Sequence, residues 1–307
     1  MIPEPVRWFP FLFLAASCGP THSQLDVAAV HSAVTRTTHV FHIVEGDTLS
    51  LDLRIPMPSI SGAPGIIFLH GGGFSQGHRS KGPHTAFLDT LAKQGIASAS
   101  ISYRLTRSGL GFGCAVPVDE KKAAVESAAQ DLMAALDWLS SSPLALPPEW
   151  VAAGSSAGAE AALRAGYAMA PQNWAGVISF AGALSSDSEI PENAPPFFAA
   201  HGTCDGVVPA DEGIHRGCHE EQAGAWSLCG GLCWAQRLSD SGLGSVSHAY
   251  CGGGHEVCNS AMLDPIMQQS LVAWLCNPNR ERLTERIYVS EGREDNSGEG
   301  PCPQPCQ

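Results

Sequence analysis

Charge, and positive charge above all, is scarce in this sequence. Only 15% of its 307 residues are Asp, Glu, Lys or Arg, whereas about 25% is usual for a globular protein. The 17 basic residues form no run, and 30 acidic residues bring the formal net charge to −13. Because nucleic acids and anionic membranes are bound by clustered basic side chains, the sequence predicts neither as an electrostatic partner.

Long apolar runs are also scarce, and a short one near the N-terminus is informative. Residues 8–16 are mostly apolar, follow Arg7 and end in small residues. This order is typical of a secretory signal, and the run is too short for a bilayer, which takes about 20 residues. We therefore predict that residues 1–18 are a signal segment; a buried N-terminal strand is the alternative.

The end of this segment resembles a bacterial lipobox. Residues 14–18 read Leu-Ala-Ala-Ser-Cys, and in a lipobox the cysteine becomes the lipidated N-terminus after cleavage. We expect an exported protein that is either secreted, or periplasmic, or held at the cell surface by a lipid on Cys18. A membrane contact is expected only through that lipid.

The cysteine pattern contains no CxxC pair. Removing Cys18 from the 11 cysteines leaves an even number, as full disulfide pairing in an exported protein requires. We expect disulfides throughout, with a connectivity that the sequence does not determine. A zinc site at Cys218 and His219, or at Cys229 and Cys233, is the alternative.

Alternating and apolar segments predict the strands. The segments 38–44 and 48–55 alternate and flank a turn at 45–47, which predicts an antiparallel hairpin at a sheet edge. Short apolar runs follow, as expected for strands covered on both faces. These candidate strands are residues 65–69, 96–103, 150–153, 176–180, 197–200 and 245–250.

Helices are expected between these strands. Residues 120–140 form the clearest helix, another starts at Ser156, and a last one lies near 262–275. The sequence therefore predicts an α/β fold: a mixed, mostly parallel eight-stranded sheet with helices on both faces and little or no cap. We expect a spacer at 19–36, a catalytic domain at 37–277 and an irregular cysteine-containing tail at 278–307.

The first chemical motif is the pentapeptide Gly-Ser-Ser-Ala-Gly at 154–158, between a strand and a helix. It matches the G-x-S-x-G nucleophile elbow, in which the central serine sits on a strained turn and its neighbours must be small. Ser156 is the predicted nucleophile because the glycines are symmetric about it and not about Ser155. The N–H of Ala157, at the helix N-terminus, is a predicted oxyanion donor.

The second motif is His-Gly-Gly-Gly-Phe at 70–74, directly after a buried strand. Glycines let the backbone turn its N–H groups toward a ligand, and a loop of this type supplies oxyanion donors in lipases and esterases. We assign Gly72 and Gly73 as donors and His70 as a structural residue. A plain glycine turn is the alternative.

Two further residues complete a predicted triad. Asp205 lies on the loop after strand 197–200, and His255 follows three glycines after strand 245–250. The chain order Ser, Asp, His is the order that this motif set uses. A histidine base that an aspartate orients activates a serine hydroxyl, and this chemistry needs neither cofactor nor metal ion.

With these residues, the chain resembles the esterase/lipase branch of the α/β-hydrolase superfamily. It looks like the carboxylesterases that carry HGGG, S-Y-R-L (102–105) and G-x-S-A-G motifs, and the resemblance spans about residues 65–275. The resemblance implies the α/β-hydrolase fold and cofactor-free hydrolysis of carboxylic esters. Two departures are Ser155, where related lipases carry Asp, and the short connection 182–196, where they carry a helical cap.

Because the connection 182–196 is short, we expect an open active site, and the substrate class is inferred from that openness. An open site suits short acyl groups, or small-molecule and carbohydrate-linked esters. A serine peptidase of the prolyl-oligopeptidase type and a non-catalytic binding protein with this fold are the alternatives. The long segment 211–244 either walls one side of the pocket or is a disulfide-pinned surface loop.

Overall fold

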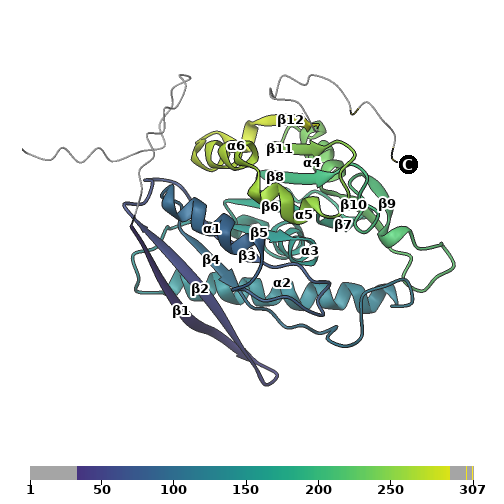
Figure 1. Cartoon of the computed structure of the whole chain (residues 1–307), viewed down its shortest axis with the longest axis horizontal. Helices are drawn as coiled ribbons and strands as arrows, with labels where there is room; N and C mark the ends of the chain where they lie inside the picture. Colours follow the sequence, from purple (N-terminus) through teal and green to yellow (C-terminus); the bar gives the residue numbers. More distant parts are fainter. Residues whose placement is uncertain (1–32, 291–301, 303–305, 307) are drawn as a thin grey trace, which may run out of the picture.

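A nine-stranded sheet forms the centre of the molecule (Figure 1). The computed structural model describes residues 33–290 together with Cys302 and Cys306. The predicted signal segment, Cys18 and most of the predicted spacer lie outside these residues. From one edge to the other, the strands are β1 (Ala33–Val44), β2 (Asp47–Met57), β4 (Ser98–Ile101), β3 (Gly65–Leu69), β5 (Trp150–Ser155), β6 (Gly176–Phe180), β8 (Phe197–Gly202), β11 (Ser245–Tyr250) and β12 (Thr284–Val289).

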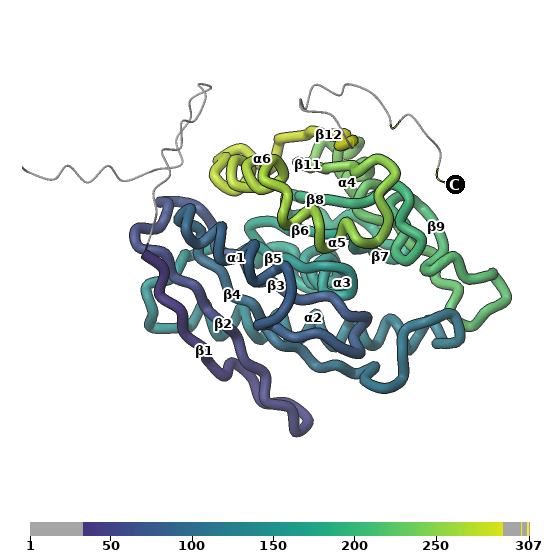
Figure 2. Tube along the Cα trace, in the orientation of Figure 1, coloured from purple at the N-terminus to yellow at the C-terminus, as the bar shows by residue number. Residues whose placement is uncertain are grey.

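The sheet is antiparallel at one edge and parallel elsewhere. The β1–β2 hairpin is antiparallel, and β2 pairs antiparallel with β4. All pairs from β4 to β12 are parallel. The hairpin turns at Glu45 and Gly46, which both have a positive φ, as a type I′ turn requires. In the view of Figure 2, the β1–β2 hairpin and β9 lie on opposite sides of the molecule.

Helices cover both faces of the sheet. The helices α2 (Val118–Ser141), α3 (Ala157–Arg164) and α4 (Gly231–Asp240) pack on one face. The opposite face carries α1 (Pro83–Lys93), α5 (Val257–Ser260) and α6 (Pro265–Cys276). Successive strand residues alternate between the two cores: in β3, Ile67 joins the α2 side and Phe68 the α1 side. This double coverage explains why β3 is apolar at successive positions.

A second, three-stranded sheet was not predicted. It consists of β7 (Ala183–Ser185), β10 (Ser227–Gly230) and β9 (Glu212–Ile214), all antiparallel. Strands of three or four residues are too short to show a period-two pattern, which is why the sequence did not reveal them. β7 lies in the connection 182–196, which contains no helix.

The predicted fold class is confirmed, with three corrections. The prediction of an irregular tail after residue 277 is wrong for β12, which adds a ninth strand to the predicted eight. Its sequence Thr-Glu-Arg-Ile-Tyr-Val is charged because this strand is a half-exposed edge. The predicted spacer at 19–36 also extends too far, since β1 begins at Ala33. The strand predicted at 96–103 is shorter, because only Ser98–Ile101 has strand partners.

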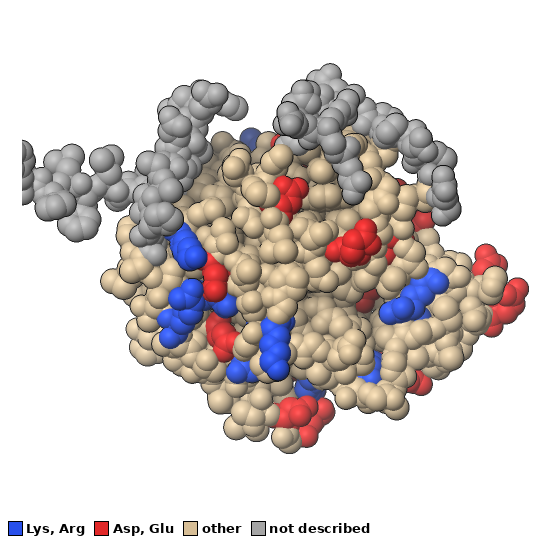
Figure 3. Space-filling model, viewed as in Figure 1, with Lys and Arg blue, Asp and Glu red and all other residues tan. Residues whose placement is uncertain are grey.

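Surface charge is sparse, as the composition predicts. On the face shown in Figure 3, basic and acidic side chains lie singly or in small mixed groups. No helix among the described residues is long and apolar enough to span a membrane.

Buried histidines make the stability of this fold depend on pH. His248 in β11 is fully buried and hydrogen-bonds Ser270 at 2.9 Å, and burial lowers its pKa to about 4. The unfolded chain, with a histidine pKa near ~6.5, therefore binds a proton between pH ~6.5 and ~4 that the folded chain does not. Stability falls as the pH decreases through this window. Burial lowers the pKa of His70 to about 4 as well, and it contributes in the same direction.

We expect His248→Leu to make the protein less sensitive to acid. The free energy of unfolding, measured with urea at pH 7 and pH 4.5, should fall less in this variant than in the wild type, by up to about 3 kcal/mol. The exposed His219 provides the control, and His219→Leu should keep the wild-type pH dependence. Equal pH dependence of His248→Leu and the wild type would contradict the prediction.

Candidate active site

Ser156 occupies a sharp turn between β5 and α3. Its backbone has φ 52° and ψ −122°, a conformation that non-glycine residues rarely adopt and that marks strained functional sites. A Cβ on Gly154 would lie 2.2 Å from Gly158, and one on Gly158 would lie 2.2 Å from the backbone oxygen of Leu69. Both positions therefore require glycine, as the elbow motif predicts.

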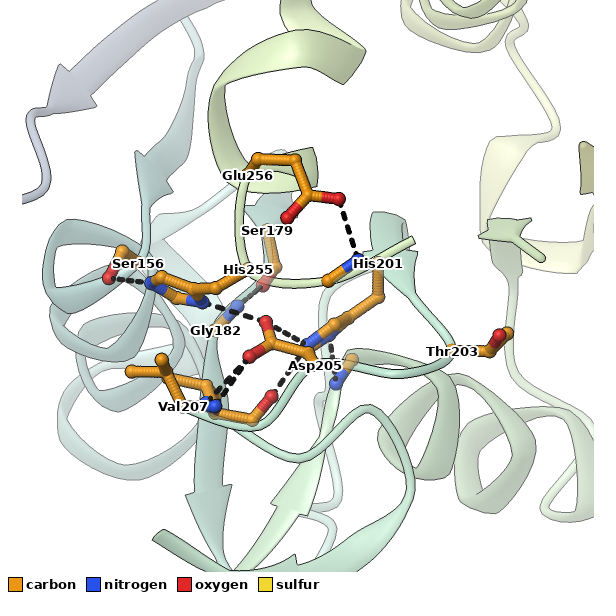
Figure 4. A network of polar contacts seen from close by, with 12 residues as sticks. Ser156, Ser179, Gly182, His201, Thr203, Asp205, Val207, His255 and Glu256 are labelled. Atoms are coloured by element: carbon orange, nitrogen blue, oxygen red, sulfur yellow. Dashed lines mark hydrogen bonds and ion pairs between the residues drawn. The ribbon is translucent and has the colours of Figure 1, made fainter. Parts of the chain in front are cut away.

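The predicted triad residues form one hydrogen-bonded line (Figure 4). Ser156 Oγ lies 2.9 Å from His255 Nε2, and His255 Nδ1 lies 2.7 Å from Asp205 Oδ2. The carboxylate fixes the neutral imidazole as the Nδ1–H tautomer, so that Nε2 presents its lone pair to the hydroxyl. The His255 side chain is 25% exposed and Asp205 is buried, so the line runs from the interior to an open surface.

Asp205 is held in its ionised form. Burial by itself would raise its pKa, but hydrogen bonds from His201 and His255 outweigh burial and keep the pKa well below its ordinary value. The other oxygen, Oδ1, accepts N–H groups from Val207 at 2.8 Å and Val208 at 3.0 Å. Since every hydrogen bond stabilises the charged form, the carboxylate stays ionised at neutral pH.

His201 is a residue of this site that the sequence did not reveal. It is fully buried at the end of β8, and its Nε2–H donates to Val208 O at 3.0 Å. The same nitrogen lies 3.4 Å from Asp205 Oδ2. Its Nδ1 accepts the N–H of Gly231 at 3.3 Å. The only signal in the sequence is its position four residues before the acid.

The loops that carry the acid and the base contact each other directly. Cys204 N–H donates to Gly253 O at 2.9 Å, and Thr203 N–H donates to Tyr250 O at 3.0 Å. A Cβ on Gly202 would lie 2.3 Å from Gly253 O, so only glycine permits this approach. The contact sets the distance between the carboxylate and the imidazole.

The glycine loop, residues 70–74, lies against the predicted nucleophile Ser156. A Cβ on Gly71 would lie 3.3 Å from the Cβ of Ser156. Gly72 and Gly73 have φ values of +125° and +61°, and their N–H groups have no acceptor among the described residues. Ala157 is the first residue of α3, and its N–H therefore has no acceptor within the helix. The oxyanion role of these three donors stays a prediction.

His70 holds this loop in place. Its ring stacks on Tyr103 with centroids 4.5 Å apart, and its Nδ1 lies 2.8 Å from Gly71 O. The hydroxyl of Tyr103 donates to His70 O at 2.8 Å. Burial lowers the pKa of His70 to about 4, so the ring is neutral at pH 7 and acts as a packing and hydrogen-bonding element.

A buried polar cluster adjoins the triad and was also missed. It consists of Glu160, one turn after Ser156 in α3, Lys121 in α2, and His215 after β9. Lys121 Nζ donates to Gly224 O at 2.7 Å and lies 2.9 Å from His215 Nδ1. Burial raises the pKa of Glu160 to about 8, against the opposing effect of Lys121 and Arg216. Burial, Lys121 and Arg216 lower the pKa of His215 to about 3, so this ring is neutral and accepts from Lys121.

Four disulfides join eight of the described cysteines. They are Cys114–Cys218, Cys204–Cys306, Cys229–Cys233 and Cys251–Cys302. The zinc alternative is thereby contradicted at Cys218, Cys229 and Cys233. The expectation of full pairing is wrong at Cys258, a buried free thiol at the start of α5. An even count shows only that full pairing is possible, whereas pairing needs two Cα atoms within about 7 Å.

Two of these disulfides attach the tail to the loops that carry Asp205 and His255. Cys204 immediately precedes Asp205 and is linked to Cys306. Cys251 lies on the loop of His255 and is linked to Cys302. Both cysteines described in the tail are therefore in disulfides, as the expectation of disulfides predicts. Both crosslinks restrain the same pair of loops whose contact positions the triad.

A family model and solved structures of esterases are similar to this chain. Residues 51–190 match the BD-FAE family model. Brefeldin A esterase, a bacterial homologue of human hormone-sensitive lipase, is 18% identical, with a TM-score of 0.56 over 84% of this chain and 80% of that one. Esterase 2 of Thermogutta terrifontis in its tabun adduct is 20% identical, with a TM-score of 0.42 over 57% of this chain and 74% of that one. No curated protein matches the chain. The predicted resemblance to the α/β-hydrolases is confirmed, and the chain has their fold.

We expect the Cys204–Cys306 crosslink to contribute more stability than Cys229–Cys233. The first joins residues 102 apart and the second joins residues 4 apart, and a crosslink lowers the entropy of the unfolded chain more when it closes a longer loop. Urea unfolding of Cys204→Ala/Cys306→Ala should show a loss of about 2–4 kcal/mol. The control Cys229→Ala/Cys233→Ala should lose less, and the reverse order would contradict the prediction.

Proposed function

We propose that this chain is a serine hydrolase that cleaves carboxylic esters through an acyl-enzyme. The observation that carries the proposal is the line of hydrogen bonds from Ser156 through His255 to Asp205 at a strained strand-to-helix turn. A serine hydroxyl is a weak nucleophile at neutral pH and becomes reactive when a base takes its proton. The proposed roles are nucleophile for Ser156, base for His255 and orienting acid for Asp205.

The reaction proceeds in two halves. His255 Nε2 takes the proton of Ser156 as Oγ attacks the ester carbonyl, and then returns it to the leaving alcohol. The resulting acyl-enzyme is hydrolysed by a water that the same imidazole deprotonates. Asp205 stabilises the imidazolium in both halves, because its carboxylate remains ionised and fixed by Val207 and Val208.

Three backbone donors stabilise the tetrahedral intermediate in this proposal. The N–H groups of Gly72, Gly73 and Ala157 lie on the two elements that meet at Ser156. Preorganised donors of this kind stabilise the developing oxyanion, and the loss of one costs roughly a hundredfold or more in rate. The positive end of the α3 dipole acts in the same direction.

The proposed substrate class rests on the short connection 182–196, which leaves Ser156 without a helical cap from that segment. The connection 182–196 contains only the short strand β7 and no helix that could cover Ser156. We propose that the enzyme acts on short-acyl esters, or on small acyl groups carried by a larger scaffold such as a carbohydrate. The esterases among the structural neighbours are consistent with ester hydrolysis in general.

An exported location is part of the proposal. Four disulfides among the described cysteines are typical of an oxidising compartment. We propose a secreted or periplasmic protein, or one anchored by a lipid on Cys18.

Ser156→Ala tests the nucleophile and the reaction class together. Wild-type protein should be labelled by a fluorophosphonate probe, and Ser156→Ala should lose labelling and nearly all esterase activity, with kcat reduced by roughly 10⁶. Ser155→Ala is the matched control, since Ser155 is the adjacent buried serine, and it should keep its labelling. Asp205→Asn should lower kcat by roughly 10⁴ because the imidazole loses its orienting partner. Persistent labelling of Ser156→Ala would remove this serine from the mechanism.

Substrate chain length tests the open site. We expect kcat/KM for 4-nitrophenyl acetate and butyrate to exceed that for the palmitate ester, because no cap provides apolar surface for a long chain. The matching acetanilide, measured in the same assay, distinguishes an esterase from a peptidase. Faster cleavage of palmitate would contradict the acyl preference, and faster cleavage of the amide would contradict the ester class.

A further inference from the structure

Arg216 has a backbone conformation that is rare for its residue type. Its φ is +57° and its ψ is 20°, and the following Gly217 also has a positive φ. Non-glycine residues adopt this left-handed conformation at a cost of roughly 1–3 kcal/mol and do so mainly at functional sites. The surrounding structure must therefore hold Arg216 in place.

Three contacts fix Arg216 between two loops of the site. Its N–H donates to Val207 O at 2.8 Å, two residues after Asp205. Its side-chain Nε–H donates to Phe112 O at 3.0 Å, and Phe112 packs beside Gly73 of the glycine loop. The Cys114–Cys218 disulfide joins the chain segments on both sides of this bond. Arg216 thus lies on the rim between the acid loop and the predicted oxyanion donors.

The guanidinium of Arg216 has no acidic partner. No carboxylate among the described residues lies within 4.0 Å of it, although the chain has 30 Asp and Glu residues. Arg107, on the neighbouring loop, pairs with Glu120 at 2.5 Å. Arg216 is also exposed, and only its Nε is engaged, so both terminal nitrogens are available to a ligand.

The groups around Arg216 leave its charge uncompensated. Lys121 is a second cation, and His215 is neutral because its pKa is lowered by burial and by both cations. Arg216 acts electrostatically on the carboxyl group of Glu160, but burial raises the pKa of that group to about 8. A carboxyl group with this pKa is mainly protonated at pH 7 and does not neutralise the guanidinium. Asp205 is the ionised carboxylate of the site, and it is engaged by His255, Val207 and Val208. The guanidinium of Arg216 therefore stays without a paired carboxylate among the described residues, in a protein with net charge −13.

We propose that Arg216 determines specificity by binding a carboxylate that the ester substrate itself carries, a few atoms from the scissile bond. The inference rests on the proposed ester hydrolysis. A guanidinium with a fixed Nε presents its two terminal N–H groups in one plane, which matches the two oxygens of a carboxylate. Hemiesters of dicarboxylic acids, and hydroxy or phenolic acids that are acylated on the hydroxyl, carry such a free carboxylate.

Pairs of esters that differ only in charge test this inference. One pair carries the charge on the alcohol part, 4-acetoxybenzoate and 4-acetoxybenzamide; the other carries it on the acyl part, phenyl hydrogen adipate and phenyl adipamate. For each pair we define the selectivity as the ratio of kcat/KM for the acid to kcat/KM for the amide. The wild type should prefer the acid in at least one pair.

Arg216→Gln should lower this selectivity by about ten- to hundredfold, as the loss of a charged hydrogen-bonded pair implies. The change should appear mainly as a higher KM for the acid, because the carboxylate does not react. Arg216→Lys should retain part of the selectivity, since charge remains but the planar fork is lost. Arg164→Gln is the charge-matched control: Arg164 pairs with Glu126 at the far end of α3, and its loss should leave the selectivity unchanged.

Two results would overturn the inference. One is a wild type that prefers the acid in neither pair, and the other is an Arg216→Gln variant with unchanged selectivity. If circular dichroism shows that Arg216→Gln does not fold, Arg216→Lys and the salt dependence of the wild-type selectivity decide. Screening by salt should lower the wild-type selectivity between about 0.05 and about 0.5 M NaCl. A wild type that cleaves neither member of either pair contradicts the proposed ester hydrolysis instead.

Discussion

The close packing of the N-terminus of α3 against the end of β3 is the constraint on which the site depends. Gly158 approaches the backbone of Leu69 so closely that a Cβ would overlap it. Because Leu69 leads directly into the glycine loop, this contact places the donors of that loop next to Ser156. The strained φ of Ser156 is the local consequence of turning from β5 into a helix that lies so near the sheet.

The remaining geometry follows from the direction of the strands. β3, β5, β8 and β11 are parallel, so the loops after them meet at one edge of the sheet, where open α/β sheets place their ligands. The acid and base loops are then joined by backbone hydrogen bonds and crosslinked to the tail. Charge is distributed unevenly across this edge: Asp205 is kept ionised, Glu160 is mainly neutral, and His70 and His215 are uncharged.

Strands and helices were predictable to different degrees. The bounds of β3 and β6 follow from the sequence because these strands are covered on both faces and are apolar at successive positions. α2 was predictable from its apolar stripe. β12 was not, because half of an edge strand faces solvent and its sequence is charged. The strands of the small sheet are too short to carry a periodic pattern.

The sequence by itself determined the residues of the elbow, the glycine loop, and the order of serine, aspartate and histidine, since each is a local motif that must have particular residue types at fixed spacing. Only the tertiary structure decided which distant groups become neighbours. The contact of Lys121 with His215 across 94 residues, the Cys114–Cys218 disulfide and the placement of Arg216 all belong to this second kind. Their partners are brought together by packing and not by spacing, so no pattern along the chain specifies them.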